Sequence, residues 1–255
     1  MQPFWKISGL TGWSTRNKEK NMRRLGIIGA MQEEVETLLE NMTEKVSVQR
    51  PVATFHQGKL EGLDVVVVQC GVGKVNAAMC AQVLCDCYGV THIVNTGIAG
   101  SLNAQLDIGD LVISRDAMYH DFDCVHFGYE MGRVPGMDVV AFPADERLIS
   151  YAQAAAEAVH PGHSRLGRVA SGDLFVAEKC AKERIIERTQ ALCTEMEGAA
   201  IAQTAYRNGV PFVILRAISD KADDSAEMDY PTFERIAAHR CASVTMHLAK
   251  QLKSP

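Results

Sequence analysis

Short apolar runs alternate with helical segments along most of the chain, and this alternation limits the fold more than any other feature. Residues 24–29, 63–70, 92–96 and 210–215 have the length and the apolar character of buried strands. Neither an internal repeat nor a Ser/Gly-rich linker divides the 255 residues. The pattern predicts an α/β fold, a single domain with a central mixed, mostly parallel β-sheet flanked by helices.

Composition narrows the possible partners. A hydrophobic content of 47% is enough for a substantial core, and the formal net charge is −5. No run of lysines and arginines is long enough to follow a phosphate backbone, so we expect no nucleic-acid partner. The longest apolar runs fall far short of the ~20 residues that span a bilayer, so we expect a soluble protein without a membrane partner.

Cysteine and histidine usage predicts neither disulfides nor a metal. The 8 cysteines are scattered singly, mostly in apolar or helical context, and we interpret them as reduced thiols of a cytoplasmic protein. Cys85 and Cys87 lack a second pair, and His160 and His163 flank Pro-Gly in a predicted loop. Neither set is a convincing zinc site by its sequence spacing.

Residues 1–21 differ from the rest of the chain. They contain both tryptophans, have no regular apolar period and lack the apolar h-region of a secretory signal. We therefore expect them to be a disordered extension outside the fold, and residues 22–255 to form the domain. Met22 directly precedes the first predicted strand, so we expect it to be the natural start, which the intact mass of the native protein would test.

The stretch from Thr194 to Asp220 combines a charged cluster, a helix rich in small residues, a turn at Asn208-Gly209 and a short apolar strand. Arg216 and Asp220 are predicted just past the end of that strand. In open α/β sheets ligands bind beyond the carboxyl ends of the strands, so both side chains are candidate site residues. The alternative is that Asp220 is a solvated loop acid.

Several glycine-containing segments leave alternatives open. Gly26/Gly29 and Gly71/Gly73 precede helices, but the third glycine of a dinucleotide fingerprint is missing in both places. Residues 97–101 allow close backbone approach, either for packing or for a ligand. The long irregular segment 118–136 is typical of functional or interfacial loops, and Phe175 is either a core residue or a platform for a base.

Five motifs together resemble a known family. They are Gly29-Ala30-Met31-Gln32-Glu33-Glu34, Asn95-Thr96-Gly97-Ile98-Ala99-Gly100, Ser171-Gly172-Asp173-x-Phe175, Glu195-Met196-Glu197 and Arg216-Ala217-Ile218-Ser219-Asp220. The set is similar to the bacterial 5′-methylthioadenosine/S-adenosylhomocysteine nucleosidases of the nucleoside phosphorylase superfamily, over residues 22–252. The resemblance implies a homodimeric α/β enzyme that uses water to release adenine, serves methionine salvage and the methyl cycle, and needs no metal or organic cofactor.

The resemblance also implies a division of labour. Asp220, helped by Ser219, would protonate adenine N7, and Glu34 would take a proton from the attacking water that Arg216 helps to hold. An ionised Glu197 would accept hydrogen bonds from the ribose hydroxyls. The remaining contacts would be Met196 and Met31 on the ribose, Phe175 stacked on adenine, the Val176 backbone at the adenine edge, Val72 and Tyr230 around the 5′-thio group, and Phe127 from the partner subunit.

One departure and three rival functions accompany the resemblance. Ile98 stands where many relatives have serine, which removes a hydroxyl near the ribose. A phosphorylase is one rival, but the loop from Gly29 to Glu34 offers carboxylates where phosphate would be repelled. A nucleosidase for another 5′ substituent, such as aminodeoxyfutalosine, is the second. A non-catalytic nucleoside-binding protein is the third, and the joint presence of Glu34, Glu197 and Asp220 argues against it.

Overall fold

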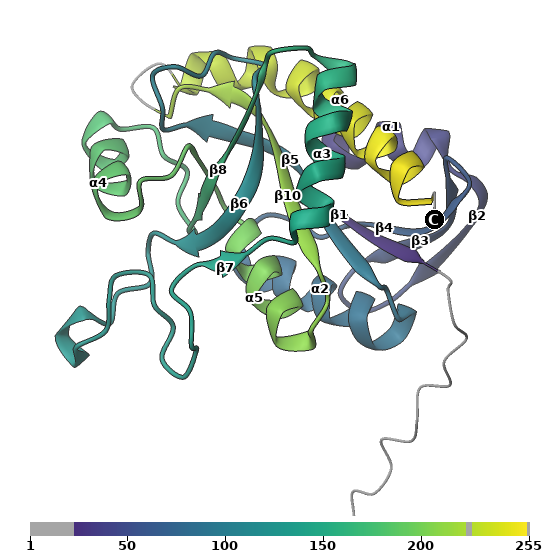
Figure 1. Ribbon diagram of the computed structural model, residues 1–255, viewed down its shortest axis with the longest axis horizontal. Coiled ribbons are helices and arrows are strands. Elements are labelled where there is room, and N and C mark those ends of the chain that lie inside the picture. The colour runs from purple at the N-terminus through teal and green to yellow at the C-terminus, as the bar shows by residue number, and fades with distance from the viewer. Residues whose placement is uncertain (1–22, 223–225, 254–255) are drawn as a thin grey trace, which may run out of the picture.

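A single β-sheet runs through the computed structural model, which describes residues 23–222 and 226–253 (Figure 1). Within these residues the sheet has 10 strands. They are β1 (Arg24–Gly29), β2 (Thr43–Gln49), β3 (Thr54–Leu60), β4 (Leu63–Gln69), β5 (His92–Ser101), β6 (Leu111–Tyr119), β7 (Phe142–Pro143), β8 (Ser164–Ser171), β9 (Cys193–Glu195) and β10 (Phe212–Asp220). The helices are α1 (Gln32–Asn41), α2 (Lys74–Tyr88), α3 (Glu146–Val159), α4 (Lys179–Thr189), α5 (Gly198–Asn208) and α6 (Ala226–Lys253), with a short 3₁₀ helix η1 (Val125–Phe127).

The sheet combines parallel and antiparallel strand pairs. The order is β10-β6-β8-β9-β5-β1-β4-β3-β2, and β10 also pairs with β5, so part of the sheet closes on itself. β1 is parallel to both β4 and β5, and β5 is parallel to β10. The hairpin of β3 and β4 and the edge strand β2 are antiparallel. The predicted α/β fold with one mixed, mostly parallel sheet is confirmed.

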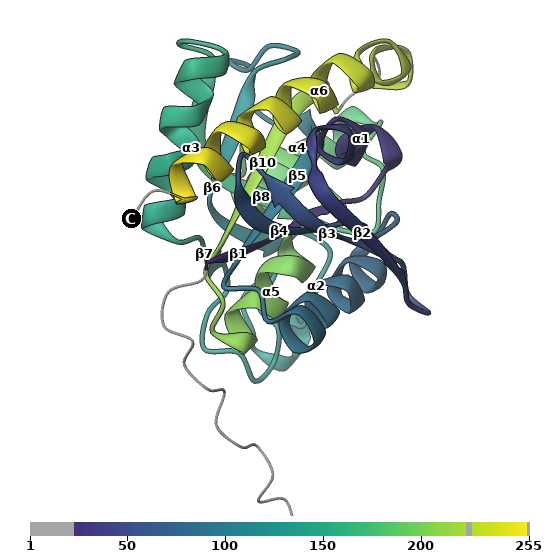
Figure 2. The same cartoon turned by 90° about the vertical axis from the view of Figure 1, so that its right-hand side faces the viewer.

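Helices cover both faces of the sheet. In Figures 1 and 2, α1, α3 and α6 lie on one side, and α2 and α5 lie on the other. The long helix α6 packs against β5 and β10 through small buried residues such as Ala238, Cys241 and Ala242. Small side chains allow this helix to approach the strands closely, which fixes the position of the strands that carry the polar residues of the next section.

The outer elements show where periodicity is informative and where it is not. β4 contains four consecutive valines, all buried, as a strand covered on both faces requires. β2 is almost wholly exposed and its sequence, TEKVSVQ, has only two apolar residues, so the sequence did not predict it. It forms because β3 offers an unpaired edge with which its backbone can bond.

Two strands continue beyond the apolar runs that predicted them. β10 was expected to end at Leu215, but it extends through Arg216 to Asp220. β5 likewise continues through the glycine-containing segment to Ser101. Each strand supplies the hydrogen-bond partner of the other along this stretch, with a bulge between Ile218 and Asp220. Arg216 and Asp220 therefore lie on the strand, and the expectation that they follow its end was wrong.

The predicted extension at residues 1–21 lies outside the described residues. Within the described part of the chain, no helix combines the length and apolar composition needed to cross a membrane.

Candidate active site

A cavity of about 350 Å³ opens at the carboxyl ends of β1, β5 and β10. Segments from both halves of the chain form its wall, which is largely apolar apart from a few carboxyl and hydroxyl groups. The lining residues are Ala30, Met31, Glu34, Val72, Ile98, Ala99, Gly100, Leu174, Phe175, Val176, Thr194, Glu195, Met196, Glu197, Ser219, Asp220 and Tyr230. An apolar cavity with a few converging polar groups is the usual form of a small-molecule site.

Glu34 is fixed in the first turn of α1. Its Oε2 accepts hydrogen bonds from the backbone N–H groups of Ala30 (2.6 Å) and Met31 (3.1 Å), and its Oε1 accepts one from Ile98 (3.0 Å). Burial raises the pKa of this carboxyl, while the charge of Arg216 and the three N–H groups lower it in part. Glu34 is thus a buried carboxylate of increased basicity, held in one orientation.

Gly97 allows Glu34 and Arg216 to approach β5. A Cβ at this position would lie 2.2 Å from Glu34 Oε1 and 2.8 Å from Arg216 Nη1. Both separations are far below van der Waals contact, so any side chain would displace the two charged groups. The sequence left packing and a ligand as alternatives for residues 97–101, and at Gly97 the nearby atoms belong to protein side chains, which corresponds to packing.

Arg216 lies behind the cavity wall, close to three carboxyl groups. Its Nη2 donates to Asn95 Oδ1 at 2.6 Å and to Glu195 Oε2, and lies 3.8 Å from Glu197 Oε2. The negative charges of Glu195, Glu34 and Glu197 raise the pKa of the guanidinium against the opposing effect of its burial. Arg216 is not among the cavity-lining residues, so its predicted contact with the attacking water stays a prediction.

Glu197 is the N-cap residue of α5 and faces the cavity. Its Oε1 accepts a hydrogen bond from the backbone N–H of Gly73 at 2.9 Å. Burial, then repulsion by Glu195, raises the pKa of Glu197 to about 8, with Arg216 opposing the shift. The shift arises because three buried acids share one cation, and the expected ionised Glu197 with a bound ribose stays a prediction.

Asp220 is held at the end of β10 and also lines the cavity. Its Oδ2 accepts a hydrogen bond from the Ser219 hydroxyl at 2.7 Å, and its Oδ1 accepts one from the backbone N–H of Ala222 at 2.8 Å. The bulge between Ile218 and Asp220 lets Ser219 and Asp220 both reach the cavity, although alternate residues of a regular strand point to opposite faces.

The apolar side of the cavity contains the residues predicted for base, sugar and thio contacts. The Phe175 and Tyr230 rings meet edge to face, with centroids 5.6 Å apart, and the Tyr230 hydroxyl donates to Met31 Sδ at 3.2 Å. Val72, Val176 and Met196 complete this side. Phe127 lies elsewhere, on η1 in the segment between β6 and β7, and 82% of its surface is exposed.

Glu195 is a site residue to which the sequence assigned no role. Its Oε2 accepts from the backbone N–H groups of Glu197 (3.1 Å) and Gly198 (2.8 Å), and its Oε1 accepts from the Ser171 hydroxyl. It thereby ties the start of α5 to β8 and to Arg216. The motif Glu195-Met196-Glu197 contained the signal, but only the tertiary structure separates the acid facing Arg216 from the acid facing Gly73. Leu174, Thr194, Ala30, Ala99 and Gly100 were also missed as lining residues.

Comparisons with known proteins agree with this architecture. The model of the phosphorylase superfamily matches residues 24–250. The 5′-methylthioadenosine/S-adenosylhomocysteine nucleosidase of Chromohalobacter salexigens is 40% identical over 232 residues, which cover 91% of this chain and 98% of the relative. Among solved structures, the nucleosidase of Colwellia psychrerythraea in complex with adenine has a TM-score of 0.88 at 36% identity and covers 91% of this chain and 96% of its own. Futalosine hydrolase of Helicobacter pylori has a TM-score of 0.86 at 30% identity, over 90% of this chain and 98% of its own.

The fold and the cavity define an enzyme of the α/β nucleoside-cleaving class. The chain belongs to the phosphorylase superfamily and, within it, to the family of the 5′-methylthioadenosine/S-adenosylhomocysteine nucleosidases. The resemblance inferred from the five motifs is confirmed.

Proposed function

We propose that this protein hydrolyses the N-glycosidic bond of 5′-methylthioadenosine and S-adenosylhomocysteine, releasing adenine and the 5-thio-substituted ribose. The observation that carries the proposal is the placement of Glu34 and Asp220 on one cavity, with Glu197 on the same wall. A carboxylate that activates water and an acid that assists the leaving group are the two elements of glycoside hydrolysis. The names of the relatives support the same substrates.

Glu34 acts as the general base. It accepts hydrogen bonds from three backbone N–H groups, which fix the carboxylate, and its raised pKa makes it a better acceptor for a proton from water. Nη1 of Arg216 and Oε1 of Glu34 both lie against Gly97, so the guanidinium is beside the carboxylate that faces the attacking water. Arg216 helps to hold this water and stabilises the ionised form of Glu34 before the proton is transferred.

Asp220 acts as the general acid on the other side of the scissile bond. The Ser219 hydroxyl orients one of its oxygens, and the Ala222 N–H fixes the other. The proton on Asp220 is given to adenine N7 as the C–N bond lengthens, which lets the base leave as a neutral molecule. Glu197 binds the ribose hydroxyls. Glu195 fixes the positions of Glu197 and Arg216 through hydrogen bonds to both residues.

The apolar side supplies affinity for the substrate. Phe175 stacks on adenine, the Val176 backbone bonds to the adenine edge, and Met31 and Met196 contact the ribose. Val72 and Tyr230 surround the 5′-thio group. Val72, Leu174 and Phe175 remain about half exposed at the cavity mouth, which supports a homodimer whose partner covers this mouth with its own Phe127.

The biological setting follows from the reaction. Adenine release from thioadenosine nucleosides places the enzyme in methionine salvage and the methyl cycle, in the cytoplasm where these nucleosides form. The catalytic residues come from both ends of residues 22–255, so this range acts as one nucleosidase domain.

Hydrolysis is favoured over phosphorolysis by the charge of the cavity. Its lining includes Glu34, Glu195, Glu197 and Asp220, and no lysine or arginine is among the lining residues that the structure describes. Phosphate would meet four carboxyl groups without a cation at the wall. We therefore expect water to be the nucleophile.

A coupled assay tests the reaction. Adenine release from 5′-methylthioadenosine, S-adenosylhomocysteine and aminodeoxyfutalosine should be measured with and without phosphate. We expect release from the two thio substrates at the same rate in both buffers. Strict dependence on phosphate would overturn hydrolysis, and a much higher kcat/KM for aminodeoxyfutalosine would move the proposal to the futalosine class that the Helicobacter pylori enzyme represents.

The variant Asp220→Asn tests the acid. It keeps the size of the side chain but cannot deliver a proton, and a positioned acid contributes ~10²–10⁴-fold in rate. We expect kcat to fall by that factor with little change in Tm. Asp64→Asn is the matched control, because Asp64 pairs with Lys59 on β4, away from the cavity. A loss of less than about tenfold in Asp220→Asn would contradict the assignment.

A further inference from the structure

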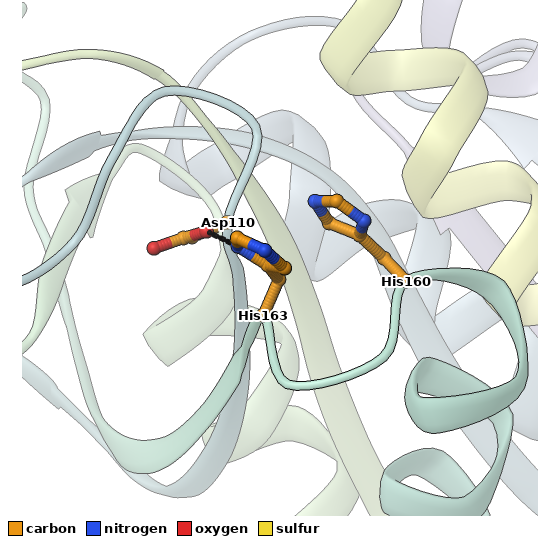
Figure 3. A group of neighbouring side chains, drawn as sticks. All are labelled: Asp110, His160 and His163. Atoms are coloured by element: carbon orange, nitrogen blue, oxygen red, sulfur yellow. Dashed lines mark hydrogen bonds and ion pairs between the residues drawn. The ribbon is translucent and has the colours of Figure 1, made fainter.

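A second cluster of chemically reactive side chains lies outside the cavity. It consists of Asp110 before β6, His160 at the C-terminal end of α3 and His163 in the turn that precedes β8 (Figure 3). Each residue offers one ligand atom, and these atoms all lie within 4.8 Å of one another. The sequence spacing of His160 and His163 did not predict a metal site. Asp110, the third residue of the cluster, lies 53 positions before His163 in the chain.

The local fold presents both imidazoles on one side of a tight turn. The His163 backbone N–H donates to the His160 carbonyl at 3.2 Å, and Gly162 between them has φ +77°, which favours glycine. The two rings stack with centroids 4.0 Å apart and planes 12° from parallel. Nδ1 of His163 lies 2.8 Å from Asp110 Oδ1, so the carboxylate joins the pair from β6.

A surface ion pair alone would explain His163 and Asp110, but it leaves His160 without a role. Within the described residues, no protein group is hydrogen-bonded to a ring nitrogen of His160. The His163 side chain is 53% exposed, so solvent and ions have access. Two imidazoles and one carboxylate, with room for water in the remaining positions, form a donor set that suits late first-row divalent ions.

We propose that Asp110, His160 and His163 form a binding site for a divalent transition-metal ion of the imidazole-preferring class, with Zn²⁺ as the representative ion. Rotation of the exposed His163 imidazole and of the partly buried His160 imidazole would bring the three donors to the ~2.0–2.2 Å that Zn²⁺ requires. Hard ions such as Mg²⁺ prefer oxygen ligands throughout and are excluded by the two nitrogens. The Arg240 guanidinium, which donates to the Gly109 carbonyl at 2.6 Å, lies close enough to His160 to repel a cation and to limit the affinity.

The position of the cluster gives the ion a structural effect. The Asp110 carbonyl accepts from the Ile218 N–H at 2.9 Å, and the Gly109 N–H donates to the Ile218 carbonyl at 2.8 Å. Ile218 belongs to β10, the strand that ends in Ser219 and Asp220. An ion on Asp110 would therefore fasten the turn between α3 and β8 to the strand that carries the catalytic acid, and would stabilise the folded protein.

Calorimetric titration of the untagged, metal-free full chain with Zn²⁺ tests the proposal. We expect one ion per chain, no binding of Mg²⁺, and affinity at least about tenfold weaker in both His160→Gln and His163→Gln. His247→Gln is the matched control, because His247 is exposed on α6 and bonds to the Ser243 carbonyl of its own helix. At free Zn²⁺ ~100-fold above Kd, Tm should rise by about 5 °C or more in wild type and in the control only.

Two results would overturn the site: Zn²⁺ affinity unchanged in both histidine variants, or binding that disappears when the exposed thiols of Cys87 and Cys180 are blocked. Adenine release without metal serves as the folding check, since His160 and His163 are outside the cavity and their variants should match wild type.

Discussion

Three carboxyl groups and one guanidinium share a buried site, and the pKa of each group depends on its contacts with the others. Arg216 contacts Glu195 directly and lies near Glu197, while Glu34 experiences its charge from the other side. One cation cannot offset three buried anions, because each ionised carboxyl loses its hydration. The raised pKa of Glu197 is the consequence, and a bound ribose that donates hydrogen bonds would favour its ionised form.

The stability of the protein should therefore depend on the ionisation of Glu197. Its pKa is about 8 in the folded state against an ordinary value of 4.5, so the folded protein binds this proton more tightly. The resulting stabilisation is complete below about pH 4.5 and is lost as pH rises through about 8. Glu197→Gln cannot ionise, so its Tm should increase relative to that of wild type as pH rises from 5 to about 8.

Thermal unfolding of wild type and Glu197→Gln across this pH range measures the effect. Glu40→Gln, on the exposed side of α1, provides the control and should follow wild type, since exposed substitutions change stability little. A Tm difference between wild type and Glu197→Gln that stays constant with pH would falsify the assignment. The same variant should release adenine more slowly, because the ribose loses a charged acceptor.

At the scale of elements, the site depends on how closely β5, β10 and α1 approach one another. Gly97 of β5 pairs with Arg216 of β10, and Glu34 reaches the same point from α1. The Lys74 ammonium lies 2.6 Å from Asp121, and the Lys74 N–H donates to Asp173, so the start of α2 is tied to the loop before Phe175. Catalytic geometry thus follows from contacts between elements that are distant in sequence.

Gly97→Ala should damage catalysis more than folding. The new methyl group displaces Glu34 and Arg216, and a misplacement of ~1 Å in a catalytic group costs about 10²-fold in rate. Overpacking should also lower stability by about 1–3 kcal/mol. Adenine release per folded molecule and Tm, measured together, separate the two effects.

Gly167→Ala is the matched control for this substitution. Its Cβ would lie 2.3 Å from Leu192 Cδ1, so it overpacks a buried position in the same way, but on β8 and outside the cavity. We expect lower stability with unchanged turnover in the control. Equal turnover in both variants would show that Gly97 serves packing alone.

At the scale of the whole molecule, one segment extends away from the body of the protein. The teal segment at the lower left of Figure 1, between β6 and β7, carries η1 and Phe127. In the proposed dimer, the exposed phenylalanine of one copy would contact the half-exposed apolar cavity mouth of the other copy. The proposed dimer would bury both.

Phe127→Ala should raise KM for 5′-methylthioadenosine while kcat changes less, because in the proposed dimer the ring would contact the 5′-thio group and not the reacting bond. Loss of one apolar contact surface of this size corresponds to about 1–3 kcal/mol, or roughly 5- to 150-fold in KM. Leu166→Ala, which removes another exposed apolar side chain on β8, should leave KM unchanged. A fully active monomer at all protein concentrations would contradict the partner role of Phe127.

The sequence by itself determined the α/β class, the order of most strands and helices, and ten of the predicted site residues that line the cavity. They are Glu34, Asp220, Glu197, Met196, Met31, Phe175, Val176, Val72, Ser219 and Tyr230. Local apolar periodicity predicted the strands and helices, and the resemblance carried by the five motifs implied these ten residues. Both signals lie in the sequence and can be recognised without a structure.

Only the tertiary structure decided the remaining features. The extension of β10 to Asp220, the edge strand β2, the position of Arg216 behind the wall and the role of Glu195 all depend on partners far away in sequence. The same is true of Asp110 beside His160 and His163. Hydrogen bonding between strands and the sharing of charge among buried groups are set by distances in space, which the spacing of residues along the chain does not contain.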